Sequence, residues 1–122
     1  MERTLLALFV IGMSVSVNGQ DSPTFRGPNR DGTYPAAVIR TDWQAKPPVI
    51  LWQKDVGYGF SQVVVSGNTA VTAGYPIDQK KSVLYGMDAG TGKELWKVEY
   101  ADSCGGLRNG VIGPVATPVI DG

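Results

Sequence analysis

Short apolar runs, each bounded by turn-forming residues, follow one another through the second half of the chain. They cover residues 49–56, 60–65, 69–75, 82–88 and 93–100, and none shows the 3.6-residue period of an amphipathic helix. Runs of this length separated by glycine, asparagine and proline are typical of β-strands. The pattern therefore predicts an all-β domain.

The run at 82–88 has apolar residues in both of its alternating sets of positions. A strand that is apolar on both faces is typical of a sheet covered by neighbours on both sides. The following run carries charged residues along its length, among them Lys93, Lys97 and Glu99. Charge of this kind discourages pairing with other sheets, so we expect this run to be the edge strand.

Four spaced residues in these two runs and the turn that joins them form the most distinctive group in the sequence: Gly86, Asp88, Gly92 and Trp96. Asp88 can accept hydrogen bonds from amides two or three positions further on, while Gly92 and the nearby Gly90 can adopt positive φ. Trp96 is too large to leave in water. The group predicts a β-hairpin with an indole packed beside its turn, and backbone capping by Asp88 is favoured over a role as ligand or base.

An internal repeat connects this hairpin with earlier residues. Residues 51–56 match residues 95–100, forty-four positions later, and both segments begin with Leu-Trp. Residues 61–67 match residues 116–122, fifty-five positions later, so the second copy contains an insertion within residues 101–114. A period in the forties is typical of propeller blades with four strands.

The four-residue spacing resembles the tryptophan-docking motif of the PQQ-like (quinoprotein alcohol dehydrogenase-like) β-propeller family. In that family the first position is usually alanine, where this chain has Gly86. The resemblance implies an antiparallel four-stranded blade and a propeller of seven or eight blades. Residues 49–122 would be the first blade and the first strand of the second, in an N-terminal fragment of an exported bacterial member. Trp52 and Trp96 are then expected to pack between neighbouring blades.

The N-terminal residues predict a signal peptide. The apolar run at 5–17 is too short to cross ~30 Å of hydrocarbon as a helix. Small residues before Gln20 place the cleavage after Gly19, so residues 1–19 would be removed and the mature protein exported to the periplasm or beyond. We expect no transmembrane segment in the mature part.

Residues 20–48 are rich in proline, glycine, asparagine, aspartate and arginine. This composition predicts an irregular leader that wraps the propeller, with Phe25 and Tyr34 as its anchors. An anion site at Arg26 and Arg30 is the alternative interpretation. The stretch 25–32 also resembles the segment that precedes the first blade in exported members of the same family.

Composition excludes several kinds of site. The chain has 11 basic and 11 acidic residues, and this neutral balance argues against a nucleic-acid partner. It contains no histidine, so it holds neither a serine–histidine triad nor a histidine metal site. Its single cysteine, Cys104, is followed by glycine, unlike the adjacent cysteine pair of many quinoprotein alcohol dehydrogenases.

Three functions are compatible with these observations. The favoured one is a non-catalytic scaffold for other exported or envelope proteins, because the sequence has repeats but no catalytic constellation. The others are a PQQ- and calcium-dependent dehydrogenase of alcohols or sugars, and a propeller module attached to another exported or membrane-bound domain. No residue is assigned to catalysis, cofactor or metal. The insertion is the predicted contact loop, represented by Cys104, Leu107, Arg108 and Asn109.

Overall fold

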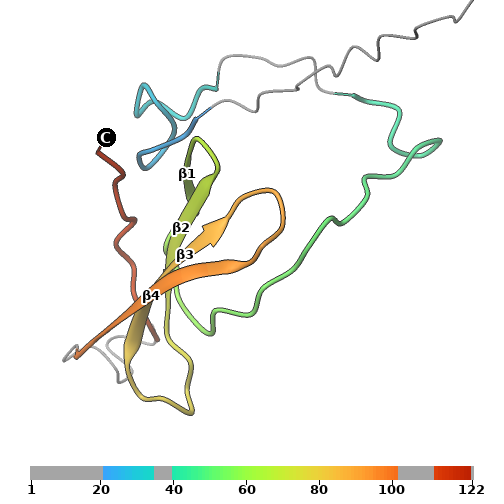
Figure 1. Ribbon diagram of the computed structural model, residues 1–122. Coiled ribbons are helices and arrows are strands. Elements are labelled where there is room, and N and C mark those ends of the chain that lie inside the picture. Colours follow the sequence, from blue (N-terminus) through green and yellow to red (C-terminus); the bar gives the residue numbers. More distant parts are fainter. Residues whose placement is uncertain (1–20, 35–39, 102–111, 122) are drawn as a thin grey trace, which may run out of the picture.

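One four-stranded antiparallel sheet organises the protein (Figure 1). The computed structural model describes residues 21–34, 40–101 and 112–121, and over these residues it contains strands and no helix. The strands are β1 (Val64–Ser66), β2 (Thr69–Gly74), β3 (Ser82–Asp88) and β4 (Glu94–Tyr100), arranged in the order β1-β2-β3-β4. Each strand pairs with the next in sequence, which confirms the predicted all-β class and antiparallel sheet.

Strand β1 is shorter than the sequence pattern indicates. The prediction placed a strand at 60–65, but ladder pairing with β2 begins only at Val64. The reason lies in the residues that precede β1, because the backbone N–H of Ala73 donates to the Ser61 hydroxyl at 3.3 Å. A side chain thus takes the place that a backbone carbonyl would occupy in a ladder, and pairing resumes only as the isolated bridge between Tyr58 and Tyr75.

The predicted strand at residues 49–56 is wrong. This segment crosses one face of the sheet and binds it mainly through side chains, with Trp52 and Val56 packed against the core. Val49, Ile50 and Leu51 are about four-fifths exposed. The apolar character of a run is not enough to make it a strand, because backbone pairing also requires a neighbouring strand.

The expected first strand of a second blade is also not formed among the described residues. Residues 112–121 have no ladder partner. Isolated hydrogen bonds tie this segment to the rest of the protein instead: the Phe60 N–H donates to the Pro114 carbonyl at 2.8 Å, the Ile120 N–H donates to the Pro23 carbonyl at 3.0 Å, and the Gln62 N–H donates to the Thr117 hydroxyl at 3.1 Å. The segment therefore lies against the sheet without extending it.

The leader is irregular over residues 21–34 and 40–48, with a single isolated bridge between Ser22 and Val65. Its predicted aromatic anchors, Phe25 and Tyr34, are both more than half exposed, and Tyr34 contacts the rest of the protein through its hydroxyl, which accepts from the Gln62 side-chain amide at 3.4 Å. Polar contacts hold it instead: Ser22 and Val65 exchange two backbone hydrogen bonds, and the Gly67 N–H donates to Asp21 at 2.8 Å. The predicted signal peptide at 1–19 lies outside the described residues.

The core lies on the face of β3 that carries Val83, Tyr85 and Met87, which are 0%, 5% and 2% exposed. Trp52 and Val56 cover this cluster from the segment that precedes the sheet. The opposite face is only partly covered. There, Leu84 and Trp96 line a groove whose other wall is formed by Pro118, Val119 and Ile120. The sheet is therefore covered on both faces, as its two apolar sets of positions predict, but unequally.

Candidate functional site

The turn between β3 and β4 is built around Asp88. Its carboxylate accepts hydrogen bonds from the Gly90 N–H at 3.1 Å, the Thr91 N–H at 2.8 Å and the Thr91 hydroxyl at 2.7 Å. Gly92 adopts a φ of +71°, whereas Gly90 does not enter the left-handed region. Asp88 therefore caps the turn, and only one of the two glycines supplies positive φ.

Asn68 completes this arrangement from the neighbouring turn. Its side-chain amide donates to the second carboxylate oxygen of Asp88, and its carbonyl accepts from the Ala89 N–H at 2.9 Å. Sequence reasoning missed this contact. The signal was available in the hairpin register, which places Thr69 opposite Asp88 and so brings Asn68 beside the β3–β4 turn.

These hydrogen bonds predict a pH dependence. The Thr91 side chain, followed by the Thr91 backbone, holds the pKa of Asp88 below its ordinary value. The stabilisation from Asp88 should thus be complete above the unfolded aspartate pKa of about 3.9 and be lost as pH falls through the lower folded-state pKa. Urea titrations at pH 5 and at lower pH should show a steeper loss of stability in the wild type than in Asp88→Asn. Equal pH slopes for the two proteins would contradict the assignment.

Trp96 lies directly over Gly86, its cross-strand partner. A Cβ atom added to Gly86 would fall 2.1 Å from Cε2 of the indole, so the ring occupies the space that any other residue's side chain would need. The prediction that Trp96 is packed against a second sheet is not met within the described residues. One side of the ring contacts its own sheet, and the side chain remains 41% exposed beside the groove formed with Pro118 and Ile120.

Trp52 makes the second contact of this kind. Its ring lies against Gly92, where an added Cβ would fall 2.5 Å from Cδ2 of the indole. Its Nε1–H donates to the carbonyl of Ala89 at 2.9 Å. Trp52 therefore docks on the turn that Asp88 caps, from outside the sheet, and all four residues of the spaced group take part in tryptophan contacts or in shaping the turn.

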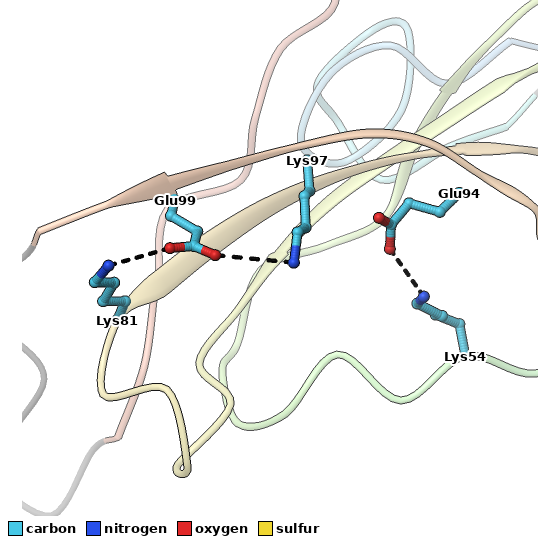
Figure 2. A network of polar contacts seen from close by, with 5 residues as sticks. All are labelled: Lys54, Lys81, Glu94, Lys97 and Glu99. Atoms are coloured by element: carbon cyan, nitrogen blue, oxygen red, sulfur yellow. Dashed lines mark hydrogen bonds and ion pairs between the residues drawn. The ribbon is translucent and has the colours of Figure 1, made fainter.

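A row of charges follows the edge next to this site (Figure 2). Glu99 accepts from Lys81 at 3.1 Å and lies 3.8 Å from Lys97, while Lys54 and Glu94 form a separate pair at 3.0 Å. Lys54 also lies 5.8 Å from the centre of the Tyr85 ring. Burial raises the pKa of Tyr85, and the positive charge of Lys54 opposes that rise. These exposed pairs contribute roughly 0–1 kcal/mol each to stability. Their main effect is therefore on the distribution of charge along the edge.

The remaining predicted site residues are not brought into this arrangement. The contact-loop residues Cys104, Leu107, Arg108 and Asn109 lie outside the described residues. Across the part of the chain that the structure describes, no three His, Cys, Asp or Glu side chains gather in a group suited to a metal ion. Those same described residues contain no helix that is long and apolar enough to cross a membrane.

Comparisons of the chain with protein-family models, with curated proteins and with solved structures found no match.

Proposed function

We propose that this sheet is a blade of an exported β-propeller of the PQQ-like repeat type, and that the propeller is a non-catalytic scaffold for other exported or envelope proteins. The observation that carries the proposal is the docking of Trp52 on the β3–β4 turn, through its contact with Gly92 and its hydrogen bond to Ala89. A tryptophan from outside the sheet thus recognises a turn whose residues occur at the spacing of the family motif.

The repeat extends this contact from one sheet to an array. Trp52 and Trp96 are forty-four positions apart, and each directly follows a leucine. Of these two repeated tryptophans, Trp52 binds the turn of this sheet. Trp96 belongs to the sheet itself and its side chain is partly exposed, so it is available to a neighbouring sheet. If each copy acts as the first does, Trp96 docks on the equivalent turn of a neighbouring sheet. Each blade would then stabilise the next, as in other repeat proteins.

The scaffold role follows from what the array would expose. Blades bury their faces against each other, so loops between strands and between blades remain at the surface and can carry binding residues. The insertion around Cys104, Leu107, Arg108 and Asn109 is the proposed contact loop, because it lengthens the connection after β4 without changing the strands of this sheet. Export, which depends on the proposed signal peptide at 1–19, would place this loop among envelope proteins.

Site-specific cross-linking tests this function. A photoreactive residue at Leu107 or Arg108, in a chain exported through its own residues 1–19, is expected to capture envelope proteins. The matched control is the same residue at Asp42, which is exposed in the leader. Capture that is no stronger at the loop than at Asp42 would contradict the scaffold role. Steady alcohol-dependent reduction of an artificial electron acceptor by the protein with PQQ and calcium would also overturn it.

A further inference from the structure

The outer edge of β4 is exposed and has no strand beside it within the described residues. Four large apolar side chains of this strand are open to solvent: Leu95 at 52%, Trp96 at 41%, Val98 at 54% and Tyr100 at 39%. An edge strand presents a row of backbone donors and acceptors that can pair with another strand. Apolar exposure along such an edge adds a driving force for that pairing.

We propose that a second copy of this chain pairs with the β4 edge, antiparallel and centred on Val98, to form one continuous sheet across two molecules. In this register Val98 lies opposite itself, Lys97 lies opposite Glu99 of the second copy, and Trp96 lies opposite Tyr100. A two-fold axis through Val98 relates the copies, so each pair occurs twice except the central one.

Charge selects this register from its neighbours. Centring the pair on Lys97 would place that ammonium group opposite itself, and centring it on Trp96 would place Lys97 opposite Leu95. Among the residues of β4 (Glu94–Tyr100), only the Val98 register makes two cross-strand pairs of opposite charge, because the Trp96 register would pair Glu99 with Lys93, which precedes the strand. Opposite charges across strands are favourable, whereas like charges directly opposite are destabilising. The charges that protect the edge from general association therefore permit one self-complementary arrangement.

The positions of the side chains suit this arrangement. Trp96, Val98 and Tyr100 pair across the sheet with Gly86, Leu84 and Ser82, so all three lie on one face. Lys97 and Glu99 lie on the opposite face, where both side chains remain accessible at 45% and 39%. The two are 3.8 Å apart within one chain, a long contact that leaves Lys97 able to turn toward a second copy.

The β-bulge of the hairpin does not disturb the proposed interface. The register shift lies between Gly86 and Met87, opposite the start of β4. The paired residues, 96–100, lie beyond it. The interface uses the strand's outer edge rather than either face of the sheet, so it goes beyond the proposed function and does not require neighbouring blades.

Charge exchange in the full chain tests the proposal. Lys97→Glu and Glu99→Lys each turn both cross-strand pairs into like-charge pairs, and each is expected to weaken self-association by about tenfold or more in sedimentation velocity experiments. Mixing the two variants restores opposite charge at both positions, so the mixture should associate about as well as the wild type. The chain that carries both substitutions should also recover self-association.

A matched control separates register from net charge. Lys46→Glu makes the same charge change in the leader, and mixing it with Glu99→Lys combines the same two net charges as the test mixture. Lys46→Glu keeps the proposed interface and should still pair with itself as the wild type does. Its hetero-pair with Glu99→Lys, followed with a fluorescent label on the Glu99→Lys chain, should be at least about tenfold weaker than the hetero-pair of the test mixture. Equal hetero-pairing of the labelled Glu99→Lys chain in both mixtures, unchanged self-association of Lys97→Glu and Glu99→Lys, or a wild type that stays monomeric at every concentration would overturn the proposal. Loss of envelope capture at Leu107 with charge-dependent pairing intact would overturn only the scaffold role.

Discussion

Replacing Gly86 with valine is expected to destabilise the sheet by about 3 kcal/mol, near the upper end of the usual cost of overpacking. The indole of Trp96 lies where the new side chain must go, because even a Cβ atom at Gly86 would fall 2.1 Å from Cε2 and 2.5 Å from Nε1 of the ring. Since Gly86 is buried in the middle of β3, its backbone is held by pairing on both sides and the ring must move. Urea unfolding followed by tryptophan fluorescence measures the loss.

Gly90→Ala is the matched control for this prediction. Gly90 lies in the β3–β4 turn, four positions after Gly86, but an added Cβ would meet nothing closer than Asp88 Oδ1 at 3.5 Å. Its φ also lies outside the left-handed region, so the substitution should change stability by no more than about 1 kcal/mol in either direction. Comparable losses of stability in Gly86→Val and Gly90→Ala would show that the loss does not come from displacing the Trp96 ring from Gly86.

Much of the sheet could be predicted from the sequence because local chemistry decides it. Strand β3 has the predicted bounds, 82–88, and β2 and β4 differ from prediction by one residue at one end. In each case an apolar run is closed by residues that favour a turn. The capping by Asp88 was predictable for the same reason, since its partners Gly90 and Thr91 are within three positions.

The rest depends on partners that are distant in sequence. Residues 49–56 have the same apolar character as a strand, but whether they pair or cross the sheet depends on whether a free edge lies beside them. The Ser61 hydroxyl interrupts the ladder through a contact with Ala73, twelve positions away. Trp52 reaches the Ala89 carbonyl across thirty-seven positions, and its acceptor is a backbone group that has no sequence signature.

The second large effect is expected at the other tryptophan contact. Gly92→Ala should cost about 3 kcal/mol, from two sources that add. Gly92 has a φ of +71°, where a residue with a side chain is strained by roughly 1 kcal/mol. The new Cβ would also fall 2.5 Å from Cδ2 of Trp52, so the ring must leave the turn and give up its hydrogen bond to Ala89 along with part of its packing.

Gly67→Ala separates these two sources. Gly67 has a φ of +54° in the turn between β1 and β2, yet an added Cβ would meet no atom within 4 Å. This control should therefore lose only the conformational part, about 1 kcal/mol, in the same urea titration. In a Trp52→Phe background, which already lacks the indole hydrogen bond, the cost of Gly92→Ala should fall toward that of Gly67→Ala. If Gly92→Ala destabilises the wild type no more than Gly67→Ala does, the contact between Trp52 and the turn does not contribute to stability. The blade proposal, which is based on that contact, would then lose its support.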